Sequence, residues 1–523
     1  MTASAKRRRV LSNDDGWIIG TYGPPLTPDH LRDYMIAPHA GSPIDVFLWS
    51  IGGHEVYDYE TEIGELFGSG YDNLDSGQQK RHDNLRQLIE EHGGPVTLIA
   101  QLCHEAGLEF FPSVRMNEHY DIPEDAVNYG RLRREHPELL IGRPGEDIPA
   151  GSLEWGIRTG LNYALPEVRA HMLAIICELI DRFDIDGIEL DFMRHPAFFR
   201  LEEAYANRYL ATDLVRQVRQ RLDTRGAARG KKLDLAVRVP PTLADAARIG
   251  LDAGVWVREG LVDLLIAGGG FRPFEMPIGE FVEAARDTPC KVYGCLEALA
   301  GVLNEEKLRA IAQRYWEAGV DGLYLFNYYS LSNQWKREVL GKLADPATLA
   351  RLDKRYELDQ SSRERPTSQL GFSFRNAIPL AQLPVLLAPT RAERGAILHL
   401  DIADDVAGAR ADDALGTCTL GLNFARLSAG DELEVKLNQS PIPWTSGRTS
   451  SNTWTHTGYD AEWNKHPSKL SETPVEGDHI DFDLDGTQIK KGINELEVRL
   501  LRADPSHPGP LDLRDVRLSI RYK

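Results

Sequence analysis

The segment Asp186–Pro196 places two acidic side chains where they could act together. It reads DGIELDFMRHP, and its apolar residues predict a buried strand over Gly187–Phe192. Because side chains alternate along a strand, Glu189 and Asp191 should point to the same face. Two carboxyl groups held at different pKa values can cleave a glycosidic bond, one ionised to stabilise or attack the sugar cation and one protonated for the leaving oxygen. Asp191, at the mouth of the strand, is the stronger candidate for this chemistry.

Glu297 is the predicted partner of Asp191. It lies in the apolar segment YGCLEALAG with no cation beside it, where loss of hydration should raise its pKa. Asp191 is followed by Arg194 and His195, whose positive charge favours the carboxylate form. We therefore expect Asp191 to be the nucleophile or electrostatic stabiliser and Glu297 to be the proton donor. Alternatively, Glu297 begins a helix and interacts with its dipole.

Arginine residues follow several of the predicted strands. Arg115, Arg194 and Arg238 would surround one cavity, which suggests a substrate with a carboxylate or sulfate group. Glu189 lies deeper than Asp191, so it could equally be structural and pair with Arg238 or Arg115.

Other polar and aromatic residues stand at the predicted strand ends, which is where barrel enzymes hold their substrates. The full set of expected substrate-binding residues is Asp14, Asp15, Trp49, His54, Arg115, Asn117, His119, Glu189, Arg194, His195, Arg238, Asn327 and Tyr328. The histidines could instead bind a metal ion with the aspartates, but no HxH or HExxH spacing is present. We expect no metal and no other cofactor.

A helix followed at once by a buried strand recurs along the first two thirds of the chain, a pattern that builds a parallel sheet. This unit recurs at least four times, and counting all candidate strands gives eight, the number that closes a barrel. They are Arg9–Asn13, Asp45–Ser50, Leu108–Arg115, Gly187–Phe192, Leu233–Val239, Val262–Gly268, Lys291–Leu296 and Gly322–Asn327. No glycine-rich phosphate loop follows the first strand, so a (β/α)8 TIM barrel is favoured over an open doubly wound sheet.

The pattern changes after about residue 345. Residues 346–366 are charged and polar, and they predict a linker or the last barrel helix. Residues 367–523 alternate with a period of two between turns rich in Gly, Asp and Pro, which predicts an all-β sandwich. Its strands are expected at Ala396–Ile402, Thr417–Phe424, Glu432–Leu437, His479–Leu484, Asn494–Leu500 and Val516–Arg521. The chain therefore divides into a barrel at 1–345 and an accessory sandwich at 367–523.

The overall composition excludes several classes of protein. The 523 residues are 42% hydrophobic and 27% charged, which is typical of a globular chain too long for one core. A net charge of −19 argues against nucleic acid as a partner. The five cysteines show no CxxC spacing and are expected to be structural. No apolar run is long enough for a signal peptide or a membrane span, so a cytoplasmic protein is expected, unless a leader has been removed.

The barrel region resembles the bacterial proteins called glycosyl hydrolase-like family 10, in whose relatives a DGIxxD strand precedes an aromatic residue and Arg-x-Pro or Tyr-Pro. The residues that carry this resemblance are Asp186, Gly187, Ile188, Asp191, Phe192, Arg194 and Pro196. The segments Leu161–Met172, Val262–Gly269 and Ala318–Tyr329 look like the same family. The resemblance implies a TIM-barrel glycoside hydrolase over roughly residues 10–340.

The same strand is similar to the DGxDxDxE motif of family-18 chitinases, with Glu189 at the middle acid and Asp191 at the last Asp. Met193 stands at the terminal acid and cannot donate a proton, so the substrate-assisted chitinase mechanism is not expected. Acids on strands four and seven are common among retaining barrel enzymes, which Asp191 and Glu297 would fit. In some of those families the strand-four residue is the acid, which would exchange the two roles.

The second domain looks like the accessory sandwiches that bind sugar, shape the cleft or hold a dimer. Trp444, Trp454 and Trp463 are the expected sugar-stacking residues, unless their loop folds back onto the barrel. The favoured function is a glycosidase or polysaccharide hydrolase acting on a carbohydrate partner. The alternatives are a non-catalytic glycan-binding barrel, which the missing acid at Met193 would suit, and a metal-dependent sugar isomerase or hydrolase.

Overall fold

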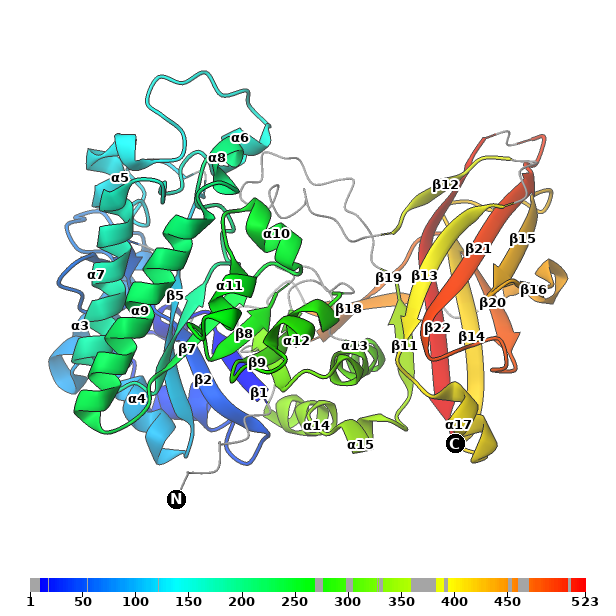
Figure 1. Ribbon diagram of the computed structural model, residues 1–523, viewed down its shortest axis with the longest axis horizontal. Helices are drawn as coiled ribbons and strands as arrows, with labels where there is room; N and C mark the ends of the chain where they lie inside the picture. The colour runs from blue at the N-terminus through cyan, green and yellow to red at the C-terminus, as the bar shows by residue number, and fades with distance from the viewer. Residues whose placement is uncertain are drawn as a thin grey trace.

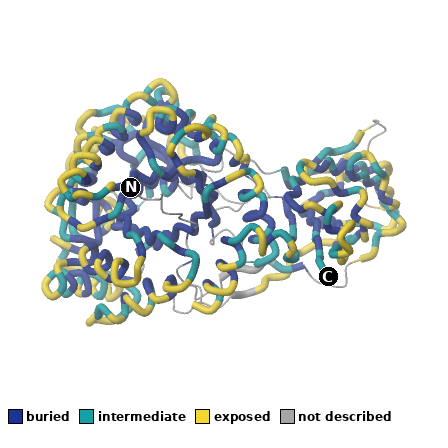
Figure 2. The backbone as a smooth tube through the Cα atoms, turned by 60° about the horizontal axis from the view of Figure 1, so that its bottom comes forward, coloured by how far each residue is buried: buried dark blue, intermediate teal, exposed yellow. Residues whose placement is uncertain are grey.

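The computed structural model describes residues 10–16, 18–53, 55–120, 122–268, 276–297, 304–326, 328, 333–358, 382–389, 394–449, 454–459, 470–506 and 509–523. These residues form a barrel surrounded by helices, with a β-sandwich beside it (Figure 1). Buried backbone runs through the centre of both parts (Figure 2).

Eight parallel strands close a ring in the order β1-β10-β9-β8-β7-β6-β5-β2. Each of the eight predicted strands overlaps one of them, so the predicted TIM barrel is confirmed. Their bounds are β1 Val10–Asp14, β2 Ile44–Ser50, β5 Glu109–Arg115, β6 Gly187–Asp191, β7 Asp234–Val239, β8 Leu264–Ala267, β9 Lys291–Glu297 and β10 Gly322–Phe326. Strands β3 (Val56–Tyr57) and β4 (Glu65–Leu66) form a small separate sheet.

Side chains alternate between the inside and the outside of this ring. The inside is filled by an apolar cluster that includes Phe111, Tyr293, Tyr324 and Phe326. Ile188 and Leu190 on β6 belong instead to the larger core that the barrel shares with its helices. Their neighbours on β6 therefore point inward, as the alternation predicts.

Helices cover the outer face of the barrel. They are α1 Ile18–Thr21, α2 Pro28–Leu31, the π-helix η1 Arg32–Ile36, α3 Ser76–His92, α4 Pro95–Glu105, α5 Arg131–Glu135, the 3-10 helix η2 Pro137–Leu139, α6 Leu153–Ile157, α7 Pro166–Arg182, α8 Leu201–Ala204, α9 Arg208–Arg229, α10 Leu243–Arg248, α11 Ala253–Arg258, α12 Gly279–Ala285, α13 Glu305–Ala318, α14 Asn333–Leu343 and α15 Pro346–Leu349. None of the helices in the described ranges is long and apolar enough to cross a membrane.

Helix α7 and the turn after it position strand β6 in the barrel. Pro166 at its first position suits a helix start, because proline lacks the N–H that a first turn leaves unused. Its apolar residues recur at helical spacing and are buried against the barrel. Asp186, just before β6, accepts hydrogen bonds from the Phe110 backbone N–H at 3.0 Å and from Lys231 Nζ at 3.2 Å. These bonds fix the start of β6 and with it the inward-facing carboxyl groups.

The C-terminal part is a sandwich of antiparallel strands, as predicted. A six-stranded sheet contains β11, β12, β22, β14, β20 and β17, and a four-stranded sheet has the order β13-β21-β15-β16. The elements are β11 Lys354–Glu357, β12 Val385–Leu387, β13 Ala396–Ile402, α17 Val406–Ala411, β14 Leu415–Phe424, β15 Glu432–Leu437, β16 Ser440–Ile442, the 3-10 helix η4 Trp444–Ser446, β17 Arg448–Thr449, β18 Thr455–Tyr459, β19 Leu470–Pro474, β20 Asp478–Leu484, β21 Gly492–Arg502 and β22 Leu511–Tyr522. Strands β18 and β19 pair with each other.

The sandwich begins earlier in the chain than the predicted boundary at residue 367. Strand β11 falls in the segment predicted to be a linker, yet it pairs with β22 along its length. Its sequence, KRYE, carries a charge at three of its four positions and so hides the strand pattern. Lys354 and Tyr356 are nevertheless buried, because both bind the carboxylate of Asp404, at 2.9 Å and 2.6 Å.

Two of the three tryptophans proposed for sugar stacking pack within the sandwich. Trp444 contacts the rings of Phe424 and Phe482. Trp454 is 9% exposed, and the guanidinium of Arg517 lies 4.1 Å from its ring centroid. Trp463 lies outside the described residues. Packing therefore occupies the two described rings.

The barrel and the sandwich meet along α13 and β11 (Figure 1). Ala310 of α13 is buried in the core of the sandwich. Nearby, the buried carboxylate of Glu357 on β11 pairs with Lys307 of α13 at 2.9 Å, with Arg355 at 2.5 Å and with Arg517 of β22 at 3.3 Å. A helix of the barrel is thus part of both cores.

Candidate active site

Asp191 ends β6 inside the mouth of the barrel and is held there by Arg238 of β7. Arg238 donates from Nε and Nη2 to the two carboxylate oxygens, both at 2.9 Å. The backbone N–H groups of Met193 and Arg194 also donate to Asp191, at 2.8 Å and 3.1 Å. Burial alone would raise the pKa of Asp191, but the charge and hydrogen bonds of Arg238 lower it below its ordinary value. The carboxylate is therefore fixed in its ionised form.

Glu189 lies deeper inside the barrel on the same face of β6. Its side chain is fully buried and accepts a hydrogen bond from Asn13 Nδ2 at 2.9 Å. Burial and the negative charge of Asp191 together raise the pKa of Glu189 to about 7. The two carboxyl groups of β6 thus differ in protonation state, although the sequence assigned the raised pKa to Glu297.

The raised pKa of Glu189 predicts a pH dependence of stability. The unfolded chain loses this proton near pH 4.5, whereas the folded protein keeps it to about pH 7. The folded state binds more protons in this window, so this group's contribution to the free energy of unfolding should fall as pH rises, by about 1.4 kcal/mol per pH unit at most. Urea denaturation across pH 4–8 gives the free energy of unfolding of the parent and of Glu189→Gln. The difference between these two values at each pH measures the contribution of Glu189. A pH-independent difference would contradict it.

Glu297 is the last residue of β9 and is 3% exposed. It pairs in register with Phe326 of β10, so it stands at the same end of the barrel as Asp191. Tyr293 and Cys295, which precede it at alternate positions of β9, belong to the cluster inside the barrel. Alternation therefore directs the side chain of Glu297 to the same inner face, at the mouth of the barrel. Residues 298–303, which follow it, lie outside the described part of the chain.

The acidic residues at the end of β1 have two different environments. Burial raises the pKa of Asp14 to about 6, an effect that the backbone N–H of Gly16 and the charge of Lys336 oppose. The Lys336 ammonium is itself buried, which lowers its pKa to about 8. Asp15 instead forms an ion pair with Arg115 of β5. Burial alone would lower the pKa of Arg115, but the carboxylate of Asp15, together with those of Glu118 and Asp191, holds it above its ordinary range.

Asn117 and His119 were predicted to bind substrate, but their described contacts hold the β5 exit loop in place. Asn117 donates to the carbonyl oxygens of Leu161 and Ala197 and accepts from the backbone N–H of Leu161 at 3.0 Å. His119 contacts the carbonyl oxygen of Gly156 through Nδ1 at 3.0 Å.

His195 and Tyr328, two further predicted substrate-binding residues, are also buried among rings. The rings of His119 and Tyr120 lie edge-on to His195, with centroids 4.7 Å and 4.4 Å away. Tyr328 is 2% exposed and stacks on Trp335. Trp49 is fully buried and belongs to the core outside the barrel rather than to its rim. His54 and Asn327 lie outside the described residues.

A cavity of about 660 Å³ opens at the ends of β1, β2, β5 and β6. Of the predicted residues, Asp15, Arg115 and Arg194 line it, whereas Asp191, Glu297 and Arg238 are not among its described lining residues. Its complete described lining is Asp15, Gly16, Gly20, Thr21, Gly52, Gly53, Val56, Phe67, Gly77, Gln78, Lys80, Arg81, Arg115, Glu118, Tyr120, Val127, Asn128 and Arg194.

Seven polar residues that line this cavity were not predicted from the sequence: Thr21, Gln78, Lys80, Arg81, Glu118, Tyr120 and Asn128. The last three lie in the connection between β5 and α5, where no strand or helix period indicates the direction of a side chain. Glu118 lies between Asn117 and His119, both of which were predicted to bind substrate. Its acidic side chain was the sequence feature that could have indicated it. Among the described residues no group of three or more His, Cys, Asp or Glu side chains is arranged to hold a metal ion.

No protein family model matches the chain, and no curated protein matches it. Several solved structures resemble its fold. One is a cycloisomaltooligosaccharide glucanotransferase from Paenibacillus sp., with 10% identity and a TM-score of 0.36 over 99% of this chain and 58% of that one. Another is α-L-fucosidase isoenzyme 2 from Paenibacillus thiaminolyticus, with 12% identity and a TM-score of 0.40 over 65% and 49% of the two chains.

The glycoside hydrolase domain of PgaB (BpsB) from Bordetella bronchiseptica has 11% identity and a TM-score of 0.40, over 65% of this chain and 99% of that one. The chain thus spans about half of the first two structures and almost all of the third. Likeness at this level concerns the fold alone and identifies neither a substrate nor a catalytic residue.

Proposed function

We propose that the barrel binds a carbohydrate chain at the carboxyl ends of its strands and hydrolyses a glycosidic bond there. The observation that best supports this is the state of Asp191, a buried carboxylate kept ionised by Arg238. It is the register partner of Arg115 on the neighbouring strand β5, and Arg115 lines the 660 Å³ cavity. A fixed negative charge beside a cavity of this size suits the stabilisation of a positively charged sugar transition state.

In this proposal Asp191 acts as the electrostatic stabiliser, because both of its oxygens already accept hydrogen bonds from Arg238. Glu297 donates the proton to the leaving oxygen from β9, three strands away around the barrel mouth. Arg238 keeps Asp191 ionised and oriented, and it fills the interior of the barrel by lying over the ring of Phe326 at 3.8 Å.

The substrate is proposed to carry a negative charge. Lys80, Arg81, Arg115 and Arg194 line the cavity, against Asp15 and Glu118 as its acidic lining residues. This local excess of positive charge occurs in a chain whose net charge is −19. Arg81 is neutralised by Asp58, whereas Lys80 donates to the carbonyl oxygen of Thr21 at 3.1 Å. An anionic group would therefore bind on the Lys80 side rather than at Arg238, which is committed to Asp191.

A glycan panel tests the proposal directly. Neutral and uronate versions of the same oligosaccharides are incubated with the parent, Asp191→Asn and Glu297→Gln, and reducing ends are counted. The parent should cleave a panel member and prefer its charged form, and each variant should lose at least about 100-fold in kcat.

Full activity of both variants on a substrate that the parent cleaves would contradict this site. Equal turnover of charged and neutral forms would contradict the anionic substrate. Binding of glycans by the parent without cleavage would support the alternative of a non-catalytic glycan-binding barrel.

A further inference from the structure

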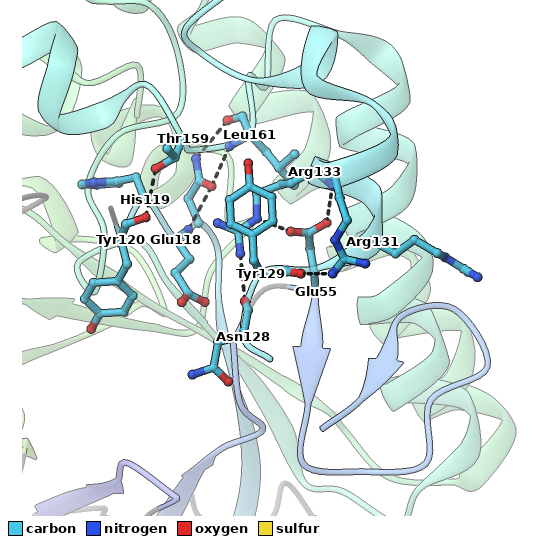
Figure 3. Close-up of polar contacts among 12 residues, drawn as sticks. Glu55, Glu118, His119, Tyr120, Asn128, Tyr129, Arg131, Arg133, Thr159 and Leu161 are labelled. Carbon is cyan, nitrogen blue, oxygen red and sulfur yellow. Dashed lines mark hydrogen bonds and ion pairs between the residues drawn. The ribbon is translucent and has the colours of Figure 1, made fainter. Parts of the chain in front are cut away.

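Glu118 is an acidic residue at the cavity that the proposed mechanism has not used. It follows β5 by three positions and is 5% exposed, yet it lines the cavity. Its carboxylate points away from the ion pair of Glu55 and Arg133 (Figure 3). It is directed toward the side on which the Tyr120 hydroxyl and the Asn128 amide lie, and both of these residues line the cavity as well.

The loop after β2 leaves room for this carboxylate. A Cβ atom on Gly53 would lie 2.5 Å from Glu118 Oε2, so a side chain there would displace the carboxylate. The neighbouring Gly52 has a φ of +116°, which favours glycine, and a Cβ there would meet the backbone of Val56 and Tyr57 at 2.9 Å. Two consecutive glycines thus keep the wall of the cavity open beside Glu118.

The backbone of Glu118 is held by its neighbour. Asn117 Oδ1 accepts from the Glu118 backbone N–H at 2.9 Å, and Asn117 Nδ2 donates to the carbonyl oxygens of Leu161 and Ala197 at 2.9 Å and 2.6 Å. The loop is therefore tied to two other parts of the barrel mouth. A side chain on a tied loop holds its position toward a ligand better than one on a free loop.

Arg115 links Glu118 to the rest of the site. Arg115 and Glu118 line the same cavity, and Arg115 is the register partner of Asp191 on the neighbouring strand. Asp15, which pairs with Arg115, lines this cavity too. The cavity volume of about 660 Å³ is large enough to hold a sugar and a water molecule together beside Glu118.

We propose that Glu118 is the catalytic base of the hydrolysis, an inference that rests on the proposed function. Glu118 takes a proton from a water molecule in the cavity while the water oxygen bonds to the anomeric carbon. The bond from that carbon to the glycosidic oxygen breaks at the same time, and this oxygen takes the proton of Glu297. Water attack on the face opposite to the leaving group inverts the anomeric configuration. Asp191 stabilises the charge that develops on the sugar.

The test compares Glu118→Gln with Glu297→Gln on two substrates. One is a cleaved oligosaccharide from the glycan panel, and the other is its dinitrophenyl glycoside, whose leaving group needs no proton. Glu118→Gln should lower kcat by about 10²–10⁴-fold on both substrates with little change in KM, because water activation is needed in each case. Glu297→Gln should lose activity on the oligosaccharide but regain kcat on the dinitrophenyl glycoside. Glu124→Gln, an exposed residue of the same connection, is the matched control and should behave as the parent.

The anomer released by the parent is read by proton NMR in the first minutes and should be inverted. Glu118→Asp, which keeps the charge but shortens the side chain, should retain part of kcat. It provides a second test of the same residue if Glu118→Gln does not fold. Retention of configuration, recovery of Glu118→Gln on the dinitrophenyl glycoside, or an effect on KM alone would overturn the role of Glu118 while leaving the hydrolase intact. A parent that cleaves no glycan would remove the proposed function and this inference together.

Discussion

Replacing Arg238 by Met should lower the free energy of unfolding by about 3–5 kcal/mol. The change leaves the carboxylate of Asp191 buried without its counter-ion, since Arg238 donates a hydrogen bond to each of its two oxygens. The double variant Asp191→Asn, Arg238→Met should regain much of this loss, because it buries no net charge. Urea denaturation of the parent, the two single variants and the double variant gives the coupling energy between the two side chains.

The same pair predicts how the loss depends on pH. The folded-state pKa of Asp191 is depressed, so its pairing stabilises the parent above about pH 3.8 and the benefit is lost as pH falls through the folded pKa. The difference between the parent and Arg238→Met should therefore shrink in acid. Arg248→Met, at a residue whose side chain is 61% exposed, is the matched control. A loss below about 1 kcal/mol would mean that the buried pair contributes no more than a surface ion pair.

Glu357→Gln should have an effect of similar size at the junction of the two domains, about 3–5 kcal/mol. The substitution removes the carboxylate shared by Lys307 of α13 and by Arg355 and Arg517 of the sandwich. These cations hold the pKa of Glu357 far below its ordinary value despite burial. The stabilisation is present above about pH 4.5 and is lost as pH falls through the folded pKa.

Asp515 should reduce the loss of stability caused by Glu357→Gln. Burial raises its pKa to about 6, and the charge of Glu357 adds to that increase. Removing Glu357 relieves this repulsion and frees cations for Asp515. Chemical denaturation near pH 7 measures the net effect, with Glu432→Gln as a control at a side chain that is 55% exposed. Equal stability of Glu357→Gln and Glu432→Gln would show that the junction does not depend on this ion cluster.

The barrel could be predicted from the sequence because its signals are local and repeated. Each parallel strand is a short apolar run, and at least four of them directly follow an amphipathic helix, so eight strands could be counted. Strand β11 was not predicted because Lys354 and Glu357 are charged, and charged residues are typical of an exposed linker, although both are buried here. Their burial depends on partners such as Asp404 and Lys307, which lie far away in sequence.

The candidate site could be predicted where it is built on strands. Alternation along β6 gave the inward direction of Glu189 and Asp191, and the structure agrees. The loops were less predictable, because a loop side chain is directed by tertiary contacts. Asn117 was predicted to bind a ligand and instead ties the loop, while Glu118 beside it lines the cavity. Trp49 was expected at the rim, but it packs outside the barrel.

Helix α13 connects the chemistry of one domain to the integrity of the other. It follows β9, the strand that carries Glu297, and its Ala310 completes the core of the sandwich. The sandwich therefore cannot be joined to a different barrel unless this face of α13 is moved with it or redesigned. Tyr315 of the same helix donates to the carbonyl oxygen of Cys295 on β9 at 3.3 Å, so a displacement of the sandwich would act through α13 on the strand that ends in Glu297.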